Sequence, residues 1–135
     1  MSLSITIIVI VLAVVVLVLL NLVNRVNVKG TDKEHFKNEW NDISELAKDP
    51  KTSPMSIINA DKLLDEALKC LGFSGNTMAE RLISAKRQIK SKDQVWSAHK
   101  LRNKLVHETS KNASKSEIKI ALSGYHKAFK ELGVF

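Results

Sequence analysis

The sequence has 135 residues, enough for one small domain and an appended segment. Lys and Arg number 21 against 14 Asp and Glu, which gives a net charge of +7, and one cysteine cannot form an internal disulfide. Because it has no Gly-rich phosphate loop, no nucleophile motif and no metal-ligand spacing, the sequence does not support a kinase, a nucleotidyltransferase or a Rossmann enzyme, and it predicts no metal and no cofactor.

An apolar run occupies residues 3–23, in which only Ser4, Thr6 and Asn21 are polar. As a helix, this run would extend about 32 Å, close to the roughly 30 Å of a bilayer's hydrocarbon core. A cleaved signal peptide is disfavoured, because no basic residue precedes the run and no Ala-x-Ala-like site follows it. A soluble core helix is disfavoured, because the run has no polar face. The sequence therefore predicts a single transmembrane anchor over residues 1–24.

The charged residues all follow this run, beginning at Arg25. Because cytoplasmic flanks of membrane spans are enriched in Lys and Arg, the N-terminus is expected outside and the C-terminal part in the cytoplasm of a single-pass cell-membrane protein. Cys70, expected as a small core side chain, agrees with a reducing compartment. From Thr31 onward, 19 Lys and Arg against 14 Asp and Glu leave an excess of +5. This charge is dispersed, and it permits contact with nucleic acid or anionic lipid without establishing either.

The remainder predicts a short linker over residues 25–31 and a helical domain over residues 32–135. N-cap residues and helical periodicity indicate five amphipathic helices, and no segment shows strand alternation. The expected helices lie between Thr31 and Asp49, Ser53 and Gly72, Thr77 and Ser91, Asp93 and Glu108, and Ser114 and Gly133.

Short connections between amphipathic helices favour antiparallel packing. The predicted fold class is therefore all-α, with one N-terminal transmembrane helix followed by an antiparallel four- to five-helix bundle. Whether the helix over residues 31–48 joins the bundle or forms a membrane-proximal arm is left open. Gly124, inside the last helix, is expected to allow close approach of a neighbour. The expected core includes Leu64, Leu68, Leu105, Leu122 and Phe129.

One stretch, residues 98–108, breaks its own amphipathic pattern. At about 100° per residue, Arg102 falls inside the apolar arc of this helix. His99, Asn103 and His107 are spaced four apart and form a polar stripe along one border of the arc. A guanidinium on the inward face costs free energy unless an anionic group meets it. Breaks of this kind mark candidate functional sites. The apolar arc itself consists of Val95, Ala98, Leu101, Leu105 and Val106.

The residues from Arg102 to His107 read as Arg, a polar residue, three more residues, then His. This resembles the R-x(4–6)-H motif of the HEPN superfamily, which comprises small all-helical domains. Many members of that superfamily are metal-independent endoribonucleases, and others are non-catalytic binding or scaffold domains. The resemblance covers roughly residues 55–132 as a helical pattern, and only the motif within it is diagnostic.

RNA cleavage by transesterification requires a base, an acid and positive charge on the phosphorane. Histidine can serve either proton role, and an arginine fork can bind two phosphate oxygens. One motif offers one His and one Arg, and the resemblance implies the superfamily's usual arrangement, in which two motifs face each other in a homodimer. The resemblance implies that Arg102 and His107 are catalytic and that Asn103 orients them, with His99 and Glu108 as weaker substrate-binding candidates. RNA is then the expected substrate, and the homodimer would form through the Arg102–His107 helix.

A structural interpretation stands beside the catalytic one. Arg102 would pair with an acidic residue of a neighbouring helix such as Asp61 or Asp65, and His107 would cap helix carbonyls near the end of its helix. The protein would then be a non-catalytic module that binds protein or nucleic acid at the membrane. His99 and His107 are about 12 Å apart along the helix axis, too far to share one metal ion.

The predicted topology can be tested with a membrane-impermeant thiol reagent on intact cells. In a Cys70→Ser background, Asn112→Cys should remain unlabelled until the cells are permeabilised, because the basic flank retains that side in the cytoplasm. Strong labelling of intact cells would reverse the predicted orientation. A shortened mature chain would favour a cleaved signal peptide.

Overall fold

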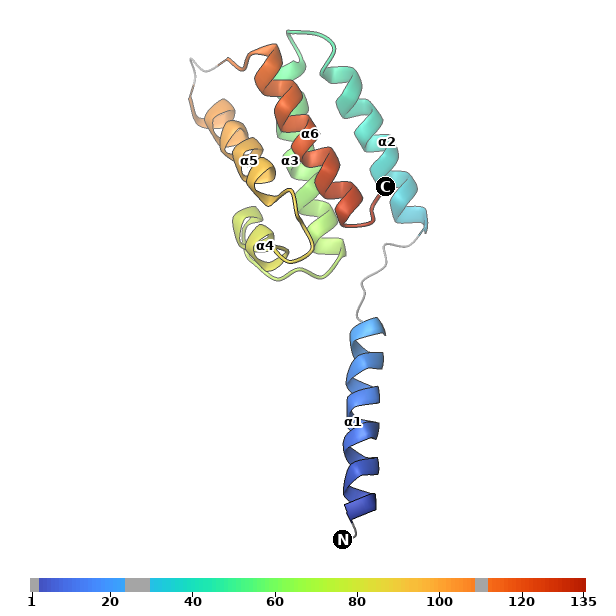
Figure 1. Ribbon diagram of the computed structural model, residues 1–135. Helices are drawn as coiled ribbons and strands as arrows, with labels where there is room; N and C mark the ends of the chain where they lie inside the picture. Colours follow the sequence, from blue (N-terminus) through green and yellow to red (C-terminus); the bar gives the residue numbers. More distant parts are fainter. Residues whose placement is uncertain (1–2, 24–29, 109–111) are drawn as a thin grey trace.

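The computed structural model describes residues 3–23, 30–108 and 112–135, except for the side chains of residues 21–23, 30 and 31. Within these ranges the chain forms six helices and no strand, which confirms the predicted all-α class (Figure 1). The helices are α1 (Leu3–Val23), α2 (Gly30–Leu46), α3 (Ser53–Cys70), α4 (Met78–Ser84), α5 (Lys92–His107) and α6 (Lys115–Glu131).

Helix α1 is the apolar run expected from the sequence. Its segment Leu3–Leu20 has a mean hydropathy of 3.5, and none of that segment is buried. By length and composition α1 could cross a membrane, although a signal sequence has the same properties. Most of the linker expected over residues 25–31 lies outside the described residues, and α2 already begins at Gly30.

Helix α3 is the centre of the bundle and contacts α2, α4, α5 and α6. Ile57, Leu64 and Leu68 on α3 are completely buried. Helix α2 belongs to the bundle, which settles the question left open by the sequence, because it packs along α3 (Figure 1). Its Phe36 is buried, and the ring of Trp40 meets rings near the C-terminus of the chain.

Two of the expected N-caps are confirmed. The side chain of Thr77 accepts a hydrogen bond from the backbone N–H of Glu80, and Ser114 forms a complete capping box with Glu117. Thr31, expected to precede the first helix of the bundle, lies within α2 and not at its N-cap position, because α2 begins at Gly30.

The other two expected N-caps are wrong. Helix α5 begins after Ser91 rather than Asp93, because the backbone N–H and hydroxyl of Ser91 both donate to the Glu131 carboxylate of α6. A contact between distant helices thus fixes this helix start. Helix α3 begins after Thr52, so that Ser53 is its first residue. Helix α4 ends at Ser84, earlier than the apolar pattern indicated, and turns lead from there to Lys92.

The core differs from the prediction at three positions. Leu64, Leu68 and Phe129 are fully buried as expected, whereas Leu105 and Leu122 are half-buried at its margin. Cys70 was expected in the core, but it lies exposed at the last residue of α3. Partial burial, with nearby Glu66 and Asp32, raises the pKa of the Cys70 thiol, which disfavours the reactive thiolate.

Gly124 is buried where α6 crosses α5. A Cβ built on Gly124 would lie 3.2 Å from the backbone carbon and oxygen of Gln94. That distance is tight for a carbon contact, and the third atom at the same distance is the Cβ of Gln94, which moves only with the backbone. The expected role of Gly124 in allowing close approach is therefore confirmed.

Burial predicts different costs for two leucines. Leu68→Ala should lower the free energy of unfolding by about 2–5 kcal/mol, because it leaves a cavity at a fully buried position of the core. Leu122→Ala should cost clearly less, because its site is open to solvent on one side. Chemical denaturation of the full chain in detergent, followed by circular dichroism, measures both. Equal losses would contradict the observed burial.

Candidate functional site

A buried carboxylate, Asp61 of α3, is the centre of the candidate site. Its side chain is only 5% exposed. The Asp61 Oδ1 atom lies 2.8 Å from Nδ1 of His99 on α5 and 2.9 Å from the hydroxyl oxygen of Tyr125 on α6. Because an ionised carboxylate only accepts, the Nδ1 atom of His99 must carry a proton and donate it. Asp61 therefore links three helices through one oxygen atom.

Tyr125 donates its hydroxyl proton to this carboxylate. The side chain is completely buried. Burial, followed by the negative charge of Asp61, raises the pKa of Tyr125 well above its usual value. The phenol consequently stays protonated at physiological pH and remains a hydrogen-bond donor.

Arg102 meets the other oxygen of Asp61. Its Nε atom lies 3.6 Å from Oδ2 of Asp61, which is an ion pair but too long for a hydrogen bond. Within the described residues this buried Nε has no hydrogen-bond partner. A terminal nitrogen of Arg102 donates to the side-chain oxygen of Asn103 at 3.0 Å. The guanidinium is thus oriented by two neighbours, while 32% of the side chain stays exposed.

These polar groups line one side of a pocket between α3, α4 and α5. Its volume is about 370 Å³. The lining contains both cationic and anionic side chains. Arg102 can therefore bind a phosphate in a pocket that also contains the Asp61 carboxylate. The lining residues are Asp61, Lys62, Asp65, Thr77, Met78, Ala79, His99, Arg102 and Asn103.

A second ion pair holds α4 beside this pocket. Arg81, itself buried, donates from Nε and Nη2 to the two oxygens of Asp65 at 2.6 and 3.0 Å, and from Nη1 to the backbone oxygen of Gly75. Burial alone would raise the pKa of Asp65, but hydrogen bonds and charge from Arg81 and Lys69 lower it. Asp65 is therefore committed to α4 and ionised, and it is not the partner of Arg102.

His107 and Glu108 lie away from the pocket. His107 is the exposed last residue of α5, and Glu108 is the exposed C-cap residue. His107 lies five positions after Arg102, which places the two side chains about 140° apart around the helix and about 7.5 Å apart along it. Of the five residues predicted from the motif, the structure gathers Arg102, Asn103 and His99 and leaves His107 and Glu108 outside.

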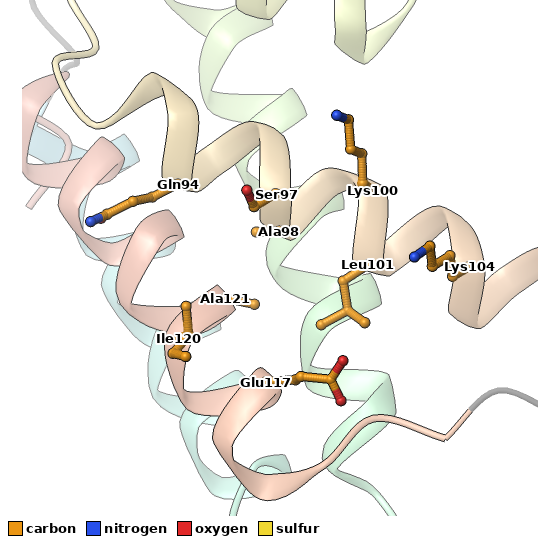
Figure 2. A pocket seen from close by; sticks show the side chains of 9 residues that line it. All are labelled: Gln94, Ser97, Ala98, Lys100, Leu101, Lys104, Glu117, Ile120 and Ala121. Carbon is orange, nitrogen blue, oxygen red and sulfur yellow. The ribbon is translucent and has the colours of Figure 1, made fainter.

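The opposite flank of α5 forms a groove with α6 (Figure 2). Leu101 and Ile120 lie in it, with Lys100 and Lys104 along the α5 side. Its volume is about 320 Å³. The groove contains neither Arg102 nor His107, so it is separate from the candidate site.

The sequence alone missed two members of the site. Tyr125 lies within the apolar stripe of the last helix, a pattern that predicts only a core side chain, although a tyrosine with a fully buried ring generally requires a partner for its hydroxyl. Asp61 was weighed only as one of two structural partners of Arg102. His99 was considered peripheral, yet it is the closest partner of Asp61. The signal in the sequence that could have identified this site is Asp61, because a carboxylate beside apolar, buried positions of a helix requires hydrogen-bond donors.

No family model, curated protein or solved structure matches this chain. Among the described residues, no three His, Cys, Asp or Glu side chains are grouped to hold a metal ion. The geometry of the site and the sequence motif are therefore the features that bear on its function.

The hydrogen bonds of Asp61 predict a graded effect on stability. Asp61→Ala should lower the free energy of unfolding by about 3–5 kcal/mol, because it leaves His99 and Tyr125 without their acceptor. Tyr125→Phe should cost about 1–3 kcal/mol, since it removes one hydrogen bond to a charged group. Arg102→Ala should cost about 1 kcal/mol or less, because its ion pair is long and partly screened by solvent.

Denaturant titration of the full chain in detergent measures this series. The order of the three losses is the decisive result. If Arg102→Ala proved the most destabilising, Arg102 rather than Asp61 would be the structural centre of the network.

Proposed function

We propose that this chain is a membrane-anchored, HEPN-like helical protein whose C-terminal domain faces the cytoplasm and cleaves RNA without a metal ion. Helix α1 is the anchor in this proposal. The protein acts as a homodimer through α5. The observation that carries the proposal is the oriented, partly exposed guanidinium of Arg102 at a pocket rim, beside Asn103.

Arg102 is suited to holding a phosphate. Asp61 and Asn103 restrain the side chain from two sides, so less conformational entropy is lost when the guanidinium binds an anion. The remaining N–H groups can donate to phosphate oxygens as a charged fork. Because the guanidinium keeps its charge throughout a reaction, it can also stabilise the dianionic phosphorane.

A proton carrier must accompany this cation. His107 of the same chain points to another side of α5, so in the proposed dimer it serves the phosphate held by Arg102 of the other copy. His99 is the alternative proton carrier, since it lines the same pocket as Arg102. Its Nδ1 is engaged by Asp61, and its Nε2 is the nitrogen left for proton transfer.

A non-catalytic interaction module is the second candidate function. The ion pair between Arg102 and the buried Asp61 supports it, because this is the structural partner that the sequence suggested. In that case Arg102 stabilises the packing of α5 on α3, and the exposed end of α5 is a binding surface for protein or nucleic acid. Stability and activity of the same variants separate the two functions.

The proposed activity predicts that the purified full chain cuts single-stranded RNA in EDTA. The products should carry 2′,3′-cyclic phosphate or 3′-phosphate ends. His107→Ala should slow cleavage by about 10²–10⁴-fold, with folding and RNA affinity nearly unchanged, because it removes a proton carrier. The Arg102→Lys variant should also cleave RNA poorly, because an ammonium cannot reproduce the bidentate contact of a guanidinium with phosphate. Gel analysis of end-labelled RNA measures each rate.

Two further variants complete the assay. His35→Ala removes an exposed histidine on α2, outside the pocket, and should cleave normally. If His99→Gln is slow while His107→Ala is not, the proton carrier is His99. If wild-type protein leaves RNA intact over a range of salt and protein concentrations, the interaction module is the remaining function.

A further inference from the structure

One end of the helical bundle lies nearest to the anchor along the chain. Helix α2 begins there, α3 and α6 end there, and α4 and the start of α5 complete it (Figure 1). We call this the anchor end. The sequence places only residues 24–29 between α1 and α2, and a chain of that length can span about 20–25 Å at most. With α1 inserted, the start of α2 is therefore held within that distance of the membrane.

The anchor end carries a cluster of positive charge between α4 and α5. Residues 86–92 contain Lys86, Arg87, Lys90 and Lys92 and no carboxylate. All four of these cationic residues are exposed. Charge that looked dispersed along the sequence is thus concentrated in a seven-residue segment at one end of the fold. We call residues 86–92 the basic segment.

The basic segment packs against the helical bundle through one buried side chain and two hydrogen bonds. Ile89, in its middle, is 1% exposed and belongs to the core. Ser91 donates two hydrogen bonds to Glu131, the last residue of α6. These contacts fix the backbone, so that the surrounding Lys and Arg side chains are held at the surface. Little ordering of the backbone therefore remains for a ligand to impose.

We propose that the basic segment docks the anchor end onto anionic lipid headgroups of the bilayer that holds α1. Lys and Arg near an anionic membrane surface are attracted within about one Debye length, and the short linker keeps the bundle within reach of that surface. Asp93 and Glu131 lie beside the basic segment, and one oxygen of Glu131 already accepts both bonds from Ser91. This inference depends on the proposed membrane insertion of α1.

Docking should hold the bundle in one orientation. Helix α5 starts at the anchor end, and Arg102 and His107 lie towards its other end. Contact of the basic segment with the headgroups would therefore hold the Arg102–His107 end of α5 away from the bilayer. Anionic lipid would in this way set the accessibility of that end of α5 to soluble partners.

The chain offers a natural position for a probe. Cys70 is its only cysteine, is exposed, and ends α3 at the anchor end. A donor fluorophore on Cys70 of the full chain, inserted in lipid nanodiscs with acceptor-labelled headgroups, reports the distance from the anchor end to the membrane. Discs of phosphatidylcholine alone are compared with discs that also contain phosphatidylserine.

Energy transfer should be higher on the anionic discs and should fall to the neutral-disc value in concentrated salt. A variant with Lys86→Gln, Arg87→Gln, Lys90→Gln and Lys92→Gln should show the neutral-disc value on both lipids. Each Lys or Arg near an anionic surface changes the equilibrium between the docked and undocked bundle about fivefold. Four substitutions should therefore weaken docking by roughly several hundredfold.

A matched control removes four exposed lysines from the opposite end of the bundle: Lys48→Gln, Lys51→Gln, Lys115→Gln and Lys119→Gln. It has the same net charge as the test variant and should retain the lipid-dependent transfer. If both variants lose the lipid-dependent energy transfer equally, the effect depends on net charge alone, and the proposal that the basic segment docks on the lipid is overturned.

The remaining outcomes are separable. If the chain stays with the discs but transfer is the same on both lipids, docking is wrong while membrane insertion stands. If the chain does not remain with the discs, membrane insertion is wrong and docking with it. If the test variant instead loses binding of single-stranded RNA, with transfer independent of lipid, the basic segment is an RNA contact and the proposal is overturned.

Discussion

The structure depends on one buried carboxylate. Asp61 lies on the helix that contacts every other helix of the bundle, where an ionised group without partners would cost several kcal/mol. His99 and Tyr125 meet this cost with hydrogen bonds from α5 and α6. Because these bonds are directional, they also fix how the two helices are placed along α3, which apolar packing alone specifies less strictly.

This constraint makes the candidate site part of the core. Asp61 and Asp65 are one helical turn apart on α3, and each binds a different element: Asp61 holds α5 and α6, whereas Asp65 holds α4 through Arg81. The pocket lies between these attachments. Its charged lining is therefore positioned by the same interactions that stabilise the bundle, so a change at Asp61 or Arg81 would affect both stability and site geometry.

Much of the fold could be predicted from the sequence, because helical periodicity and local capping determine it. The capping residues Thr77 and Ser114 depend on neighbours three residues away, and both were identified correctly. Ser91 could not be identified in the same way, since its partner Glu131 is 40 residues distant. The side-chain burial of Leu105, Leu122 and Cys70 also depends on which helices cover them, and periodicity does not contain that information.

The site could be predicted only in part, for the same physical reason. An arginine inside an apolar arc must find an anionic partner, and this rule led to Asp61 as one of two candidates. It could not choose between Asp61 and Asp65, because the choice depends on the position of Arg81 on α4. The motif also groups Arg102 with His107, whereas the packing of α5 groups Arg102 with His99. Residues that belong to one sequence motif do not necessarily lie on the same face of the helix.

The proposed membrane anchor would limit the form of the proposed dimer. Two copies inserted in one bilayer with the same orientation would be related by a two-fold axis along the membrane normal. Since α5 begins at the anchor end, Arg102 and His107 lie about 15 Å and 22 Å further along the helix axis. A cleft formed there between two copies would open away from the lipid, towards soluble RNA. The positions of the anchor and of the motif are thus geometrically compatible with one shared site.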